Sequence, residues 1–94
     1  MSHDDRLLAA QKRVEETIKR ILQERNLKQD SPFRWLRFPD TTLFVLECRV
    51  DKLRCTWSIS EDSLLMYPGD AEAKIRLDQY LQQRLAVQRS PLWR

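Results

Sequence analysis

The stretch LFVLECRVDKLRCTWSIS (43–60) constrains the fold more than any other part of the chain. The apolar positions of its second half are Leu53, Cys55, Trp57 and Ile59, and a polar residue stands between each two of them. The first half carries a matching apolar set, so a two-residue turn at Asp51–Lys52 would place apolar opposite apolar throughout. Because a slip of one residue would turn one set toward water, we predict an antiparallel hairpin with strands over 42–50 and 53–60 and one register.

Segments with helical periodicity precede and follow this hairpin in the sequence. Apolar residues recur at spacings of three and four near both ends of the chain, and they predict helices over about 3–27 and 70–88. Acid-before-base pairs at i,i+4, such as Glu15 and Lys19, support the first helix. Asp70 is placed to cap the second helix at its start.

The remaining segments are less regular. SPFRWLRF predicts a further strand over about 33–38, followed by a turn at PDTT. The run 64–67 is a candidate for a fourth strand, and 89–94 is expected to be irregular. The chain is therefore predicted to be a single α+β domain, 1–94, in which one face of a three- to four-stranded antiparallel sheet carries an N-terminal and a C-terminal helix, in the order α-β-β-β-(β)-α.

The sequence lacks the residues that several classes of function usually require. One glycine leaves no glycine-rich phosphate loop, and His3, the single histidine, stands at the start of a helix. We therefore expect no enzyme, no cofactor and no metal site. No apolar run approaches the ~18 residues of a membrane span, and the N-terminus is acidic where a signal peptide is basic. The expected location is cytoplasmic, without membrane association.

Cys48 and Cys55 stand directly opposite each other in the predicted register, on the apolar face of the hairpin. Their Cα separation of ~5.5 Å would allow a disulfide by distance, but side chains that stand perpendicular to the sheet would have to bend together. A zinc site would need about four ligands, and the chain has one histidine. Packing is the favoured interpretation, and redox sensing and an intermolecular metal site are the alternatives.

The polar face of the hairpin concentrates positive charge. The net charge is +3, and residues 33–60 contribute five basic and three acidic residues. Arg49 is predicted to lie opposite Arg54, where like charges repel. An acidic partner, a phosphate backbone or another anion would relieve this repulsion; alternatively Glu47, Asp51 and solvent relieve it within the protein.

The face of the sheet without helices is also expected to be partly apolar, since Leu43 and Val45 point toward it. Exposed apolar patches commonly mark association surfaces. The favoured hypothesis is thus a non-enzymatic protein–protein interaction module, a small adaptor, assembly factor or complex subunit, whose partner is another protein or a second copy of the chain. The candidate partner-binding residues are Arg34, Trp35, Arg37, Arg49, Lys52, Arg54 and Trp93.

Nucleic acid is the alternative partner. The order α-β-β-β-α is similar to that of the double-stranded-RNA-binding domain, whose second helix begins with a lysine-rich signature. The corresponding stretch here is DAEAK, in which Ala73 and Lys74 agree and two acids replace lysines. In this alternative the phosphate contacts would be Arg34, Arg37, Arg49, Lys52 and Arg54, and affinity would fall steeply with salt.

Overall fold

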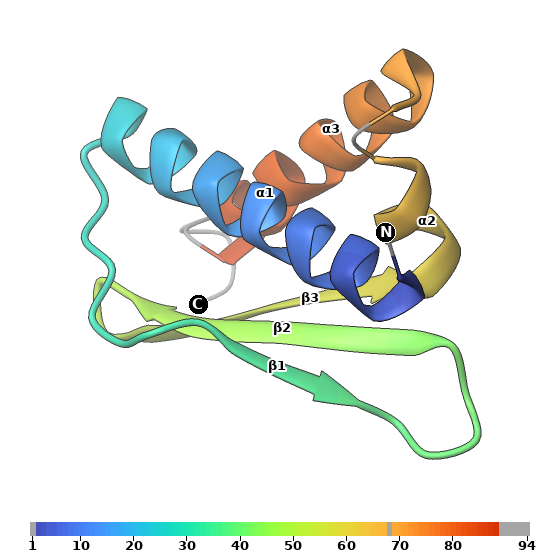
Figure 1. Cartoon of the computed structure of the whole chain (residues 1–94). Coiled ribbons are helices and arrows are strands. Elements are labelled where there is room, and N and C mark those ends of the chain that lie inside the picture. The colour runs from blue at the N-terminus through green and yellow to red at the C-terminus, as the bar shows by residue number, and fades with distance from the viewer. Residues whose placement is uncertain (1, 68, 89–94) are drawn as a thin grey trace.

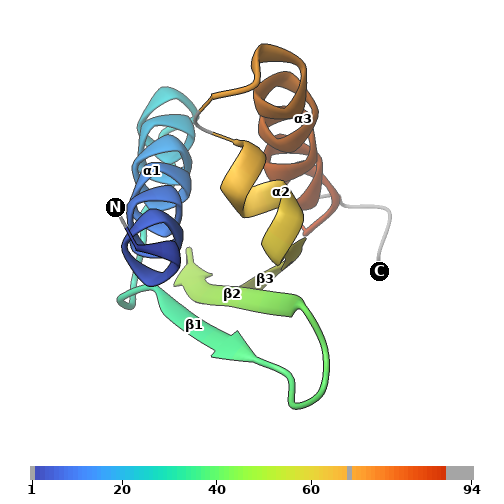
Figure 2. The same ribbon diagram turned by 45° about the vertical axis from the view of Figure 1, so that its right-hand side comes forward.

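Three helices cover one face of a three-stranded antiparallel sheet in the computed structural model, which describes residues 2–67 and 69–88 (Figure 1). The sheet has the order β1-β2-β3. The short helix α2 lies between α1 and α3 at one end of the sheet (Figure 2). The predicted α+β class and the helix-covered sheet are confirmed. The elements are α1 (His3–Glu24), β1 (Arg34–Arg37), β2 (Leu43–Val50), β3 (Leu53–Ser60), α2 (Glu61–Met66) and α3 (Ala71–Gln88).

The β2–β3 hairpin has the predicted register. Its buried pairs are Phe44–Ile59, Leu46–Trp57 and Cys48–Cys55; in the pair next to the turn, Val50 is buried but Leu53 is 49% exposed. Trp57 is 0% exposed, and its indole N–H donates to the carbonyl oxygen of Leu81 on α3 at 3.2 Å. Trp57 is thus buried with its indole N–H hydrogen-bonded, and this contact fixes the position of α3 over the sheet.

The predicted fourth strand over 64–67 is wrong, because this run belongs to α2 and the residue after it. The Ser60 side chain accepts a hydrogen bond from the N–H of Ser63 and so caps the helix. The buried side chains of the run are Leu64 and Tyr67, three positions apart, which is a helical spacing. The capping serine and the spacing together favour a helical turn over a strand.

Helix α1 ends three residues earlier than predicted because the chain turns at Asn26. This residue has a φ of 55°, the left-handed conformation that asparagine tolerates. The N–H of Leu27 donates to the carbonyl of Leu22 at 2.8 Å, and the N–H of Asn26 donates to that of Gln23 at 3.2 Å. This is a Schellman motif, which satisfies the last carbonyl groups of the helix.

A chain of hydroxyl groups links the three helices above the core. Thr17 of α1 lies 2.7 Å from the hydroxyl of Tyr67, and that hydroxyl donates to the Asp78 carboxylate of α3 at 2.9 Å. Burial raises the pKa of Tyr67, which keeps the phenol protonated as a donor. The polar atoms of this buried junction are therefore paired with one another.

The loop between α1 and β1 holds the β2–β3 turn. Asp51 donates its N–H to the carbonyl of Lys28 at 2.8 Å, and its carboxylate accepts from the N–H of Lys28 at 3.1 Å. Asp30 accepts from the N–H of Lys52. These contacts stabilise a turn in which Asp51 and Lys52 have φ values of 51° and 68°, the pattern of a type I′ hairpin turn.

Substituting Lys52→Gly is expected to stabilise the fold relative to Lys52→Ala by about 1 kcal/mol, since a residue with a Cβ atom is strained at positive φ and glycine is not. Both variants lose the same ammonium group, so the comparison isolates the backbone. Urea denaturation of the two variants measures the difference. Equal midpoints and slopes would show that the loop contacts, not the residue type, set the energy of the turn.

Candidate functional site

Cys48 and Cys55 lie in the core as free thiols, opposite each other on β2 and β3. Burial raises the pKa of Cys48 to about 12, and burial also raises the pKa of Cys55. A buried thiol is a poor nucleophile because the reactive thiolate is disfavoured. No group of three or more His, Cys, Asp or Glu residues that could hold a metal occurs in the described part of the chain. The packing interpretation agrees with this environment.

The free energy of unfolding is expected to fall as the pH rises from about 9 toward 12. Above its ordinary pKa each thiol loses its proton in the unfolded chain but keeps it in the folded one, so ionisation favours unfolding. The slope approaches about 1.4 kcal/mol per pH unit for each thiol. Urea denaturation between pH 8 and 10 measures this slope, which should be smaller in the double variant Cys48→Ala/Cys55→Ala. An equal slope would contradict the raised pKa values.

The sheet face opposite the helices, here called the outer face, carries three arginines around one glutamate. Arg49 is paired with Arg54 across β2 and β3, and Arg34 is paired with Glu47 across β1 and β2. Cross-strand partners in an antiparallel sheet point to the same side. The outer face therefore brings together Arg34, Arg49 and Arg54, here called the arginine cluster. The sequence predicted the pairing of Arg49 with Arg54 and allowed either Arg34 or Arg37 to extend it.

Glu47 lies in the middle of this cluster. Its carboxylate accepts a hydrogen bond from the Nη2 of Arg54 at 2.7 Å, and it lies 3.8 Å from the Nη1 of Arg34. The Glu47 side chain is only 14% exposed, whereas those of Arg34 and Arg54 are 71% and 72% exposed. The hypothesis that Glu47 balances part of the charge within the protein is thus confirmed.

No carboxylate in the described residues neutralises the charge of Arg49. Its backbone N–H donates to Ser31 at 2.8 Å, but its guanidinium makes no hydrogen bond or ion pair to any residue in 2–67 or 69–88. Glu47 thus contacts Arg34 and Arg54 but not the guanidinium of Arg49. A hollow of about 520 Å³ adjoins the cluster, and its lining includes Pro32 and Phe33. An anionic group in this hollow would meet the unbalanced charge.

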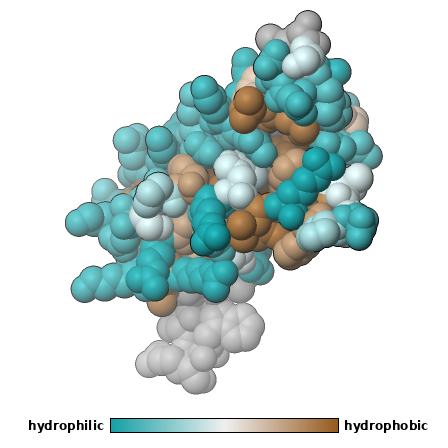
Figure 3. Space-filling model, turned by 60° about the horizontal axis from the view of Figure 1, so that its bottom comes forward, coloured by the Kyte–Doolittle hydropathy of each residue, from teal (hydrophilic) through white to brown (hydrophobic). Residues whose placement is uncertain are grey.

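Apolar side chains extend the outer face away from the cluster. Leu36 of β1 and Val45 of β2 are cross-strand partners, Leu43 follows on β2, and all three are partly exposed. In the space-filling view of this side, hydrophobic patches lie near the middle and are bordered by hydrophilic side chains (Figure 3). The expected combination of arginines and partial apolar character is present.

Two of the candidate residues occupy the other side of the sheet. Trp35 is the cross-strand partner of buried Leu46, and its indole N–H donates to Glu15 of α1 at 2.6 Å. Arg37 is the partner of Phe44; its guanidinium lies 5.3 Å from that ring and 3.9 Å from the Glu61 carboxylate. Arg34, and not Arg37, is therefore the first-strand arginine that extends the cluster, and Trp35 contacts α1.

Lys52 and Trp93 are the two candidates that remain. Lys52 is in the β2–β3 turn, where its backbone N–H bonds to Asp30 and its side chain is exposed. Trp93 lies outside the described residues. Sequence reasoning missed Leu36 as the outer residue of β1, because that strand is apolar on both sides and its phase could not be read. Its cross-strand pairing with Val45 is the signal that identifies it.

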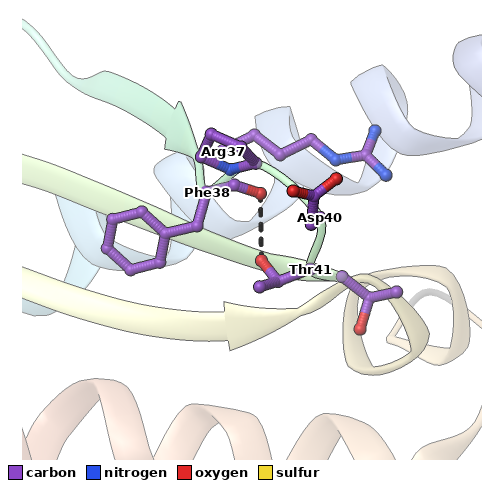
Figure 4. A pocket seen from close by; sticks show the side chains of 6 residues that line it. Arg37, Phe38, Asp40 and Thr41 are labelled. Atoms are coloured by element: carbon purple, nitrogen blue, oxygen red, sulfur yellow. Dashed lines mark hydrogen bonds between the residues drawn. The ribbon is translucent and has the colours of Figure 1, made fainter.

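A second hollow, of about 750 Å³, lies at the β1–β2 loop (Figure 4). Its walls are consecutive residues from Arg37 to Thr42. Within the loop, the Thr41 hydroxyl donates to the carbonyl of Phe38 at 3.0 Å and accepts from the N–H of Leu43 at 3.3 Å. Because these polar groups are used to hold the turn, the arginine cluster is the stronger candidate for binding.

The chain matches no protein-family model, no curated protein and no solved structure. Among residues 2–67 and 69–88, none of the helices has both the length and the apolar character needed to cross a membrane. The order of elements also differs from that of the double-stranded-RNA-binding domain, since α2 stands between the last strand and the last long helix.

Proposed function

We propose that this protein is a non-enzymatic interaction module that binds an acidic surface of another protein through the outer face. The observation that supports this most directly is the excess of guanidinium groups over carboxylates in the arginine cluster, beside half-buried Leu36 and Val45. Arginine is enriched at protein–protein interfaces and among the residues that contribute most to their binding energy. A small cytoplasmic adaptor, assembly factor or complex subunit would use such a surface.

Glu47 bears on the choice between protein and nucleic acid. The Glu47 carboxylate lies among the arginines that would contact phosphates. Its negative charge would repel those phosphates. Phosphate oxygens are bound by arginine and lysine, by neutral side-chain donors and by backbone N–H groups. An acidic protein side chain, in contrast, can approach Arg49 at the rim of the cluster while Glu47 continues to bind Arg54. We therefore favour a protein partner and keep nucleic acid as the alternative.

Charge reversal at Arg49→Glu/Arg54→Glu is expected to weaken partner binding by at least about tenfold, since two attractive contacts become repulsive. Both side chains are exposed, so the fold should persist. The matched control is Arg6→Glu/Lys12→Glu, which changes the net charge equally on exposed positions of α1. The measurement is quantitative co-purification from the native host, followed by a binding titration with the recovered partner.

Circular dichroism of each variant checks that it remains folded. A folded double reversal that still retains its partner would contradict the proposal. Titration of the unmodified chain with duplex RNA and duplex DNA at two salt concentrations tests the alternative. Strong, salt-dependent binding that Arg49→Glu/Arg54→Glu abolishes would favour nucleic acid over an acidic protein.

A further inference from the structure

The two edges of the sheet differ in whether their backbone groups are paired. Along the outer edge of β3, the N–H of Ser58 donates to the hydroxyl of Tyr80 at 2.9 Å, and the Nε of Arg84 donates to the carbonyl of Thr56 at 3.1 Å. Both side chains come from α3, which packs along this strand. Helix α3 therefore satisfies the edge groups that another strand would need.

The edge formed by β1 has no such cover in the described part of the chain. The N–H of Phe38 donates to the carbonyl of Leu43 at 3.3 Å, and hydrogen-bonded pairs alternate along an antiparallel ladder. The peptide groups of Arg34 and Leu36 thus face β2, and those of Trp35 and Arg37 point away from it. No residue in 2–67 or 69–88 bonds to the backbone N–H or carbonyl of Trp35 or Arg37.

The side chains of these two edge residues are anchored, so the edge is held in an extended shape. Trp35 bonds to Glu15 of α1, and Arg37 contacts Phe44 and Glu61 on the helix-covered side. The strand is also paired with β2 over its full length. A backbone that is already ordered loses little conformational entropy when another strand binds.

The charges beside this edge indicate the kind of strand that fits. Arg34 and Arg37 project on opposite sides of β1. Each lies near one carboxylate, Glu47 at 3.8 Å and Glu61 at 3.9 Å, but their side chains remain 71% and 54% exposed and so stay open to a further carboxylate. A second copy paired through β1 would bring its own Arg34 and Arg37 into the same short ribbon. Like charges across paired strands are destabilising, whereas acidic residues there would be attracted.

We propose that the free edge of β1 binds an extended, acidic segment of a partner protein as a fourth strand of the sheet. The acidic character of this partner rests on the proposed function, but the mode of binding is a separate statement about the edge. Main-chain hydrogen bonds to Trp35 and Arg37 supply affinity in this mode, and acidic side chains beside Arg34 and Arg37 supply specificity.

The probe is a synthetic twelve-residue peptide of alternating glutamate and valine, and the control peptide has lysine in place of glutamate. The first variant, Arg37→Pro, removes an N–H that the fold does not use, and proline is tolerated at such edge positions. The matched variant, Arg37→Ala, loses the same guanidinium but keeps the N–H. Arg37→Pro is expected to bind the acidic peptide at least about fivefold more weakly than Arg37→Ala, because one backbone hydrogen bond is lost.

Amide hydrogen exchange of the unmodified chain gives a readout that needs no variant to fold. Without peptide, the amides of Trp35 and Arg37 should exchange rapidly while that of Leu36 is protected. With the acidic peptide, all three should be protected, and the lysine peptide should leave the first two unprotected. This result, together with the difference between the Arg37 variants, would support the proposal.

Three results would overturn it. Peptide binding without protection of Trp35 and Arg37 would place the peptide elsewhere; if Arg49→Glu/Arg54→Glu also abolishes that binding, the outer-face function stands and only the edge proposal fails. Protection that grows with protein concentration in the absence of peptide would identify a second copy as the occupant. Absence of peptide binding at low salt would exclude an acidic strand at this edge, while co-purification still decides the proposed function separately.

Discussion

The pairing of β2 with β3 is the constraint on which the rest of the structure depends. It places the largest side chain, Trp57, beside Leu46 in the centre of the helix-covered face, and the Trp57 indole then fixes α3 through the Leu81 carbonyl. The same register sets the opposite face. Because side chains alternate along a strand, burying Cys48 and Cys55 requires Arg49 and Arg54 to project together on the outer side. The β2–β3 register therefore determines both the composition of the core and the position of the arginines on the outer face.

The outer face keeps an uneven charge balance within this frame. The Glu47 side chain is largely buried between Arg34 and Arg54 and orients their two guanidinium groups. It does not contact the guanidinium of Arg49. The arginine side of each pair is exposed, and ion pairs in contact with solvent contribute little to stability, typically below about 1 kcal/mol. Their arrangement therefore matters more for recognition than for folding, since an incoming carboxylate finds cations already positioned. At the border of this surface, the edge of β1 adds directional backbone groups that no residue in 2–67 or 69–88 binds.

Prediction from sequence succeeded for elements with a repeated apolar pattern. It failed for elements whose conformation depends on a single contact. The hairpin register followed from strict alternation over residues 43–60, and both long helices followed from their periodicity. The run 64–67 was too short to show a period, and the Ser60 cap decided that it is helical. The end of α1 depended on Asn26 adopting a left-handed conformation, a signal present in the sequence but easily overlooked.

By itself the sequence determined the two-layer architecture, the inward direction of both thiols and the cross-strand pairing of Arg49 with Arg54. These follow from periodicity, which any burial of apolar surface must respect. Only the tertiary structure decided the phase of β1, because that strand has apolar residues on both faces and its orientation is fixed by Glu15 bonding to Trp35. It also decided which sheet edge is covered, since Tyr80 and Arg84 reach β3 from a helix distant in sequence. Contacts between residues far apart in the chain carry no local pattern, so the tertiary structure alone reveals them.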